Sequence, residues 1–360
     1  MVDADRPRLL RQPMWPSTPA VMLVRMKPCY VLSDAERDQL ATVLRSVAKN
    51  PYEDHEVFSR AVGDLVARGE VPAFFVGVCA RVREDRSTGA SEAHVLRNCP
   101  LDPEIPVLDL DDPVADKHAK KKTFIGEAFL ELFAQLVGTP LLSYATRFNG
   151  DFFTDVIAIN RYSGMQTGFS DSELVYHNDR TAHRVRADFI SLLGMRCPEG
   201  EFIYTGFVDG RDLLDHLGDE EQNQLRQAQF VTPFDVLSRD NNGDLTVSEV
   251  HPILENHHSF RYLDTCTTVA PGAREAAKDA LLALKNALVR ADKTRHRIQT
   301  GDLFVFANQD GLHSRDKMEI NDPARARQRW LLKTYAFRDG AAAGRHDGEW
   351  LDGVRGRVGD

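Results

Sequence analysis

The stretch GDLFVFANQDGLHSRDKMEINDPARARQRWLLKTYAF, residues 301–337, contains two apolar runs joined by a polar segment. The first run covers residues 301–308 and the second covers residues 330–337. Short apolar runs that are bounded by Gly, Asp and Asn are typical of buried β-strands. We therefore predict two strands, with a loop between them that presents His313 and with Arg329 at the start of the second strand.

Four further runs of the same kind precede this stretch. They are TDVIAINRY (154–162), ELVYHND (173–179), DFISLLGMRC (188–197) and EFIYTGFVD (201–209). A series of runs of about 6–10 residues, separated by turn residues, favours an antiparallel sandwich or barrel. Helices that we predict over residues 211–229 and 273–291 interrupt the series, and we expect them to lie outside the sheets.

The chain before these runs has helical patterns. Residues 33–49 (SDAERDQLATVLRSVAK) begin with a capping Ser and place Leu and Val at helical spacing, and the pattern returns over residues 53–68 and 122–136. We predict an α+β fold in which a single domain, residues 21–338, has a helical N-terminal layer. The Pro- and Arg-rich residues 1–20 are expected to be poorly ordered, and residues 339–360, rich in Gly and charge, to form a flexible tail.

The composition excludes several classes of protein. The 360 residues include 45 Lys and Arg against 54 Asp and Glu, with 42% hydrophobic and 28% charged residues, which is ordinary for a globular protein. The longest nearly uncharged apolar stretch, residues 71–80, is about half of the roughly 20 residues that a membrane-spanning helix needs. The first residues show no apolar signal segment, so we expect a cytoplasmic protein that does not bind membranes.

The acidic balance also argues against a nucleic-acid partner, which would require concentrated Lys and Arg. The one basic run, KHAKKK at residues 117–122, has no interleaved aromatic residue and is predicted to be a solvated loop. The five cysteines are odd in number and scattered, which predicts reduced thiols rather than a disulfide framework.

Two polar clusters are weak candidates for metal sites. The segment SRDNNGDLTVSE (238–249) matches several positions of a calcium-binding EF-hand loop, but it begins with Ser where that loop needs Asp. Its Asn-Gly pair is a hairpin signal instead. His251, His257 and His258 lie close in sequence, but adjacent side chains in an extended segment point to opposite faces. We therefore predict a surface or supporting role for these histidines.

A third constellation is a stronger candidate. His177 and Asp179 end the run ELVYHND, and the period of two in a strand sends both side chains to the same face. His313 supplies a second imidazole from the later loop. Two histidines and one carboxylate on one face form the facial triad of non-haem Fe(II) oxygenases, although zinc would accept the same ligands. Arg329 favours iron, because an arginine facing the barrel interior can bind a carboxylate in a bidentate pair.

With these residues the chain resembles the Fe(II)/2-oxoglutarate-dependent oxygenases, and among them the clavaminate synthase-like branch of the taurine dioxygenase superfamily. The resemblance covers about residues 95–338. Its motifs are LRNCPLDPEIP (96–106), MQTGFSDSELVYHND (165–179), RADFISLLGMRCPEG (186–200) and the stretch 301–337. It implies a double-stranded β-helix, or jelly roll, in which His177, Asp179 and His313 hold Fe(II). It also implies that Arg329 anchors the distal carboxylate of 2-oxoglutarate and that O₂ is the co-substrate.

The chain departs from its relatives near the second strand. Arg327 has the usual spacing from His313, whereas Arg329 keeps the arginine-tryptophan pair of the family, and we assign 2-oxoglutarate to Arg329 because it begins the strand. Lys333 replaces a common arginine and is predicted to bind substrate as a point charge, but not as a fork. Asp179 replaces the glutamate of many arginine and lysine hydroxylases, which argues against transferring their substrate directly.

Two further residues are candidates by the same resemblance. Thr205, in IYTGF, would donate a second hydrogen bond to 2-oxoglutarate, with a core-edge threonine as the alternative interpretation. Asp264 lies where amino-acid-hydroxylating relatives bind a cationic side chain, with a plain surface charge as the alternative.

The sequence leads to one main hypothesis about function. The chain is expected to be an oxygenase that hydroxylates an unactivated C–H bond of a free or derivatised amino acid in specialised metabolism, with desaturation and cyclisation as other outcomes at that carbon. Oxidation of a non-amino-acid carboxylate or sulfonate is the alternative within the same class. A catalytically silent β-barrel that binds a small acid or a metal is the alternative from another class.

Overall fold

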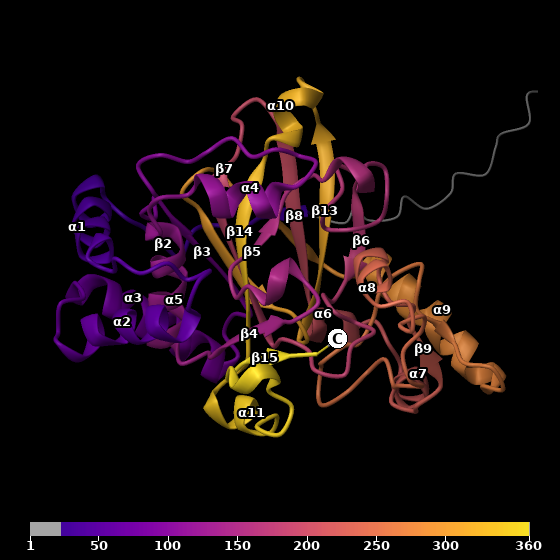
Figure 1. The fold of residues 1–360 in the computed structure, drawn as a ribbon. Helices are drawn as coiled ribbons and strands as arrows, with labels where there is room; N and C mark the ends of the chain where they lie inside the picture. The colour runs from indigo at the N-terminus through magenta and orange to yellow at the C-terminus, as the bar shows by residue number, and fades with distance from the viewer. Residues whose placement is uncertain (1–22, 360) are drawn as a thin grey trace, which may run out of the picture.

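The computed structural model describes residues 23–359, apart from the side chains of Leu23, Val24 and Met318, and these residues form two main sheets flanked by helices (Figure 1). The predicted disorder of residues 1–20 lies outside the described residues. The smaller main sheet has the strand order β1-β11-β8-β13-β6. Its strands are β1 (Leu23–Arg25), β11 (Lys293–His296), β8 (Phe202–Asp209), β13 (Gly311–Glu319) and β6 (Leu174–His177).

The larger main sheet has the order β15-β4-β14-β7-β12-β3-β2, and β5 also pairs with β14. Its strands are β15 (Arg357–Val358), β4 (Leu141–Tyr144), β14 (Trp330–Ala336), β7 (Phe189–Arg196), β12 (Leu303–Ala307), β3 (Ala93–Arg97), β2 (Tyr30–Val31) and β5 (Thr154–Val156). The central pairs β14–β7 and β7–β12 are antiparallel. A third, two-stranded sheet pairs β9 (Phe230–Val231) with β10 (Thr268–Val269).

Strand β12 shows why the strand segments are continuous runs of apolar residues in the sequence. Leu303 and Val305 pack into the cluster under the N-terminal helices, whereas Phe304 and Phe306 pack with Phe207 of β8 between the two sheets. Successive side chains of a strand point to opposite faces, and here both faces are buried. The predicted α+β fold with a double-stranded β-helix core is confirmed, and both predicted strands of the stretch 301–337 form. The predicted loop that presents His313 is wrong, because His313 lies in strand β13, which pairs with β8 and β6.

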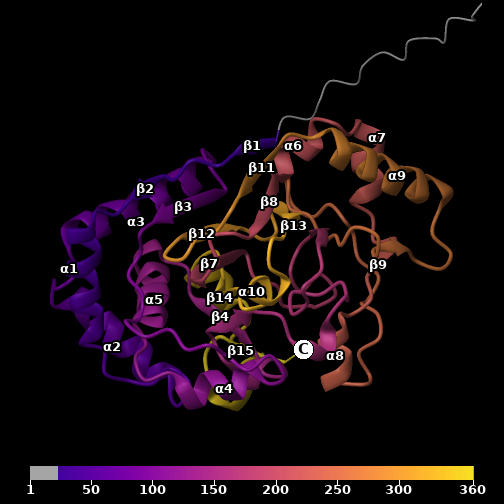
Figure 2. The same ribbon diagram turned by 90° about the horizontal axis from the view of Figure 1, so that it is seen from above.

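The N-terminal helices cover the outer face of the larger sheet (Figure 2). They are α1 (Asp34–Arg45), α2 (His55–Ala67), α3 (Ala73–Thr88) and α5 (Ile125–Val137). The predicted cap of α1 is present, because the Ser33 hydroxyl accepts from the Glu36 amide in a capping box. Helix α3 was not predicted, because its apolar residues are spread around the helix rather than gathered on one face. None of the described helices is long and apolar enough to cross a bilayer.

Other helices cover the outer face of the smaller sheet. The predicted helix over residues 211–229 is two helices, α6 (Gly210–Leu214) and α7 (Asp219–Leu225), because the chain turns at Gly218. Helix α9 (Glu275–Arg290) matches its prediction and packs with α7 beside that sheet (Figure 2). The segment with EF-hand-like spacing begins inside α8 (Val236–Asn241), so it does not form the loop between two helices that an EF-hand requires.

The prediction of a solvated loop at residues 117–122 is wrong. Most of the run belongs to helix α4 (Pro113–Lys120), and the side chain of Lys117 is fully buried. Its Nζ lies 2.7 Å from Asp155 of β5, which is also fully buried. Lys121 lies 2.6 Å from Asp102 and 3.0 Å from Glu127. Lys117 and Lys121 are buried because these carboxylates neutralise them.

The prediction of a flexible tail over residues 339–360 is also wrong for the part that the structure describes. After helix α11 (Gly340–Gly344), strand β15 pairs in parallel with β4, and Val358 is buried. Short 3₁₀ turns complete the fold at Phe148–Gly150, Asn160–Tyr162 and Leu351–Gly353, and helix α10 (Pro323–Arg327) precedes β14. The five cysteines are free, as predicted.

Candidate metal and co-substrate site

His177 and His313 are brought together by strand pairing. His177 ends β6, His313 lies near the start of β13, and the two residues are direct partners in the antiparallel register. In β13, Leu312 packs toward α9, so the alternation of the strand turns His313 toward the interior, where its ring lies 4.7 Å from that of Phe306. The centroids of the two imidazole rings are 4.2 Å apart.

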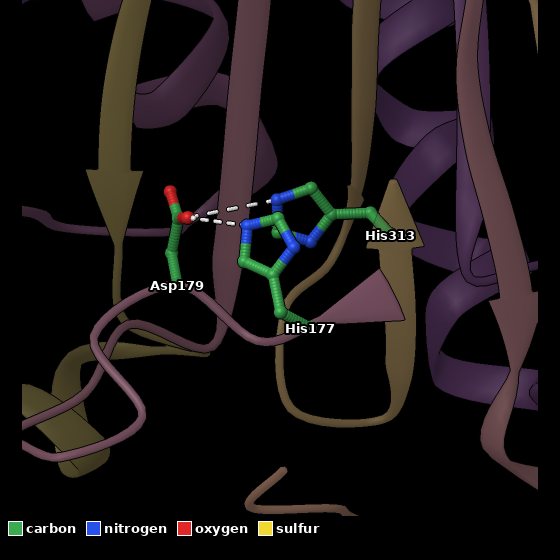
Figure 3. A group of neighbouring side chains, drawn as sticks. All are labelled: His177, Asp179 and His313. Carbon is green, nitrogen blue, oxygen red and sulfur yellow. Dashed lines mark ion pairs between the residues drawn. The ribbon is translucent and has the colours of Figure 1, made fainter. Parts of the chain in front are cut away.

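Asp179 completes the group that was predicted from the sequence (Figure 3). Its Oδ1 lies 3.3 Å from Nε2 of His177 and 3.6 Å from Nε2 of His313. All three potential ligand atoms are within 4.8 Å of one another. One oxygen and two imidazole nitrogens that converge on one point from one side can hold a divalent metal and leave its other positions open.

Hydrogen bonds fix the segment that carries these groups. The Nδ1 of His177 is 2.7 Å from the carbonyl oxygen of Val175, so Nδ1 must donate there and Nε2 keeps its lone pair for a metal. Asn178 points away from the metal group, and its side chain bonds Gly311 and Tyr262. Asn308 accepts from the Asp179 amide at 2.7 Å. We did not predict these asparagines, although the strand period implies that Asn178 faces away from its neighbours.

The Asp179 carboxylate is held in its charged form. Burial alone would raise its pKa, but Lys333, together with His177 and His313, holds the pKa well below its usual range. Burial, with the neighbouring His177, lowers the pKa of His313 to about 4, so this imidazole is neutral at neutral pH and able to bind metal. The Oδ2 of Asp179 lies 3.0 Å from Lys333 Nζ and accepts from the Tyr335 hydroxyl at 3.1 Å.

A cavity between the two sheets, here called the inner cavity, contains both predicted co-substrate residues. Thr205 of β8 and Arg329, just before β14, line it together with His177, Asp179 and His313. Arg329 is almost completely buried, and its Nη2 has no hydrogen-bond partner among the residues that the structure describes. A buried guanidinium nitrogen without a partner costs free energy, so this group fits a carboxylate that enters the cavity.

Two sequence candidates are placed elsewhere. Arg327 forms an ion pair with Asp171 and does not line the inner cavity. Asp264 accepts from Tyr262 at 2.7 Å and pairs with Lys285 at 3.0 Å, so its carboxylate is engaged on the surface side of the fold. Lys333 does line the inner cavity, but its closest partners are Asp179 and Tyr335.

A second cavity, here called the outer cavity, adjoins the inner one and shares His177, Asp179 and Lys333 with it. Its empty space of about 760 Å³ includes a part that is open to solvent. Arg147 and Arg180 also line it. We did not predict these arginines, but Arg180 directly follows the metal-ligating motif and has a positive φ of 63°, a backbone conformation that often marks functional sites.

The surface or supporting role of His251, His257 and His258 stays a prediction. His251 is buried and bonds Thr232. His258 lies near Glu92 and Asp310, and their potential ligand atoms are within 4.8 Å of one another. Both oxygens of Asp310 already have partners, Ser259 and Arg338. This second group is therefore part of an ion-pair network.

Comparison with known families agrees with this geometry. Residues 124–335 match the model of the family described as "Taurine catabolism dioxygenase TauD, TfdA family". The matched segment begins in the helical layer, at the start of α5, and ends in β14. It contains the facial group, Thr205 and Arg329.

Two characterised relatives are similar in sequence. L-asparagine oxygenase of Streptomyces coelicolor is 26% identical over 260 residues, which is 71% of this chain and 73% of that protein. Enduracididine beta-hydroxylase of Streptomyces hygroscopicus is 26% identical over 201 residues, which is 55% of this chain and 53% of that protein.

Solved structures share the fold. The asparagine oxygenase structure in complex with Fe(II), 2S,3S-3-hydroxyasparagine and succinate has a TM-score of 0.73 at 21% identity, covering 92% of this chain and 99% of that one. The non-heme iron oxygenase OrfP, in complex with Fe, succinate and (3R,4R)-dihydroxy-L-Arg, has a TM-score of 0.75 at 21% identity, covering 92% and 100%. Because the family model matches more than half of the chain, this protein belongs to the TauD, TfdA family and is a non-haem iron dioxygenase that depends on 2-oxoglutarate.

Proposed function

We propose that this enzyme hydroxylates an unactivated C–H bond of a free or derivatised amino acid, as part of specialised metabolism. The observation that carries the proposal is the inner cavity, in which the facial group, Thr205 and the incompletely bonded Arg329 meet. The relatives named above include an asparagine oxygenase and an enduracididine hydroxylase, which supports an amino-acid substrate.

In this proposal His177, Asp179 and His313 hold Fe(II). Arg329 binds the distal carboxylate of 2-oxoglutarate, and Thr205 donates a second hydrogen bond to it. Bound iron and 2-oxoglutarate, with O₂, supply the oxidant for the C–H bond and yield succinate and CO₂. The chain itself orients these groups and excludes water through the apolar lining of Ile190, Leu192 and Phe306.

The co-substrate assignment is tested by anaerobic titration of Fe(II) and 2-oxoglutarate, with detection of the weak visible charge-transfer band of a chelated keto acid. We expect the band in the wild type, and we expect His177→Ala and Arg329→Ala to weaken it. Arg327→Ala is the matched control, because it removes the same charge outside the inner cavity. A wild type without the band at saturating concentrations would overturn the assignment.

The substrate assignment is tested by succinate release over a panel of free amino acids, N-acylated amino acids, simple carboxylates and sulfonates. We expect release to be stimulated by members of the amino-acid groups and to be abolished by His313→Ala. Stimulation only by simple carboxylates or sulfonates would contradict an amino-acid substrate and leave the enzyme class intact.

A further inference from the structure

Two buried guanidinium groups line the outer cavity beside the metal ligands. Arg147 directly precedes the 3₁₀ turn Phe148–Gly150, and Arg180 directly follows Asp179 in the chain. Each residue is 6% exposed. Because both line the same cavity as His177 and Asp179, a molecule positioned for oxidation there lies next to their positive charges.

Hydrogen bonds hold the two arginines in fixed positions. The Ser238 hydroxyl accepts from Arg147 at 3.1 Å and from Arg180 at 3.2 Å. The Arg180 guanidinium also contacts Nδ1 of His183 at 3.2 Å and stacks over the Tyr144 ring at 3.9 Å. Such contacts reduce the entropy that a guanidinium loses when it binds a carboxylate, so the pair is preorganised.

The described residues that line the outer cavity carry more positive than negative charge. Lys333 is matched by Asp179, at 3.0 Å. Asp235 forms an ion pair with Arg147 and also interacts with the charge of Arg180, and its carboxylate caps helix α8, so this one acid serves two arginines. Burial, together with the charges of Arg180 and Arg147, lowers the pKa of His183, so this imidazole stays neutral. Within this buried wall the electrostatic potential therefore favours an anion.

The described residues of the same wall provide no unengaged carboxylate for a cationic side chain of a substrate. The carboxylates among its described residues are Asp179 and Asp235, and both are engaged as above. Asp264, the sequence candidate for binding a cation, does not line the outer cavity, although its neighbours Leu263 and Thr265 do. A guanidinium or ammonium side chain would therefore lose its hydration without gaining a carboxylate partner.

We infer that the substrate is an acid whose side chain or distal end carries a carboxylate bound by Arg147 and Arg180, such as an acidic amino acid or a comparable dicarboxylate. This inference rests on the proposed function, and it narrows the substrate class of that same site. A planar carboxylate matches the donor geometry of a guanidinium, whereas the amide of the same shape carries no charge to match.

The test uses pairs of ligands that differ only by carboxylate and amide, namely aspartate with asparagine and glutamate with glutamine, plus N-acetylated pairs and arginine. Binding to the anaerobic enzyme loaded with Fe(II) and 2-oxoglutarate is measured by calorimetry. We expect the carboxylate member of at least one pair to bind about tenfold more tightly than its amide, as a charged hydrogen bond provides. If every amide, or arginine, binds as tightly as the best acid, the inference is wrong.

Variants of the two arginines test whether these residues cause the preference for a carboxylate over its amide. In Arg180→Gln the ratio of the amide dissociation constant to the carboxylate dissociation constant should fall to near one, with the amide affinity little changed. Arg180→Lys should retain part of the preference for the carboxylate. Arg186→Gln is the control, because Arg186 pairs with Glu255 and is not among the described lining residues. An unchanged preference in Arg180→Gln and Arg147→Gln would overturn the inference. An intact charge-transfer band with 2-oxoglutarate in each variant separates such a failure from a failure of the proposed function.

Discussion

The Nζ of Lys333 lies 3.0 Å from Oδ2 of Asp179, on the oxygen of that carboxylate that is not directed at the two histidines. The Tyr335 hydroxyl donates to the same oxygen. The two oxygens of Asp179 therefore have different partners, so the carboxylate is prepared to offer a metal one oxygen and not two.

Replacement of Lys333 tests this arrangement. Lys333→Met keeps the aliphatic volume but removes one of the two donors to Oδ2, and we expect the affinity for Fe(II) to fall by about 10–100-fold, as is usual when a group that orients a ligand is lost. Tyr335→Phe keeps the charge and removes one hydrogen bond, so its effect should be smaller. Metal titration with Co(II) as a spectroscopic probe measures both. Equal effects of the two variants would contradict a dominant role of the lysine charge.

Arg329 and Arg327 are distinguished by a matched pair of variants. Arg329→Gln should raise the dissociation constant of 2-oxoglutarate by about 10–100-fold, because a charge-assisted pair contributes about 1.5–3 kcal/mol. Arg327→Gln breaks an ion pair with Asp171 outside the inner cavity and should change that constant less than threefold, or about 0.7 kcal/mol. Anaerobic titration of both variants decides the assignment, and the opposite order would transfer it to Arg327.

Asn308 is expected to stabilise the metal-binding segment. Its fully buried side chain bonds the amide of Asp179 at 2.7 Å and the carbonyl of Ala187 at 2.9 Å. Asn308→Ala leaves these groups without partners, which should lower the free energy of unfolding by about 1–3 kcal/mol and weaken metal binding. Denaturant titration measures the first effect. Asn286→Ala, at an exposed position of α9, should change stability by no more than about 0.5 kcal/mol.

The effects of substituting Lys117 and Asp155 on stability are expected to be strongly coupled, because the two side chains form a buried ion pair. Lys117→Met leaves a buried carboxylate without its cation and should cost about 3–5 kcal/mol of stability. Lys117→Met combined with Asp155→Asn removes both charges and should recover most of that loss, because the asparagine can still accept from Trp330 Nε1, which now donates to Asp155 at 2.8 Å. Lys122→Met, in the same basic run but exposed, is the control. Additive costs in urea denaturation would contradict the coupling.

Local sequence patterns were sufficient for much of the fold and for the facial group. The apolar runs at residues 301–308 and 330–337 form strands because burial on both faces requires apolar side chains at successive positions. His177 and Asp179 share a face because the strand period is two, and that geometry is already present in the sequence. The proximity of His313 does not follow from this period, because periodicity does not report which strands pair.

Only the tertiary structure determined which charged side chains pair with one another. Lys117 and Lys121 of the basic run are buried because Asp155, Asp102 and Glu127 neutralise them. Asp264 and Lys333 each pair with a residue that is distant in sequence, and the sequence alone does not report such pairs. Arg147 and Arg180 meet at Ser238 of α8. The sequence by itself determined the strands and the shared face of His177 and Asp179, because short-range periodicity encodes them. Only the folded chain determined which charges neutralise each other and which face the substrate, because Coulomb interactions depend on distances that sequence separation does not fix.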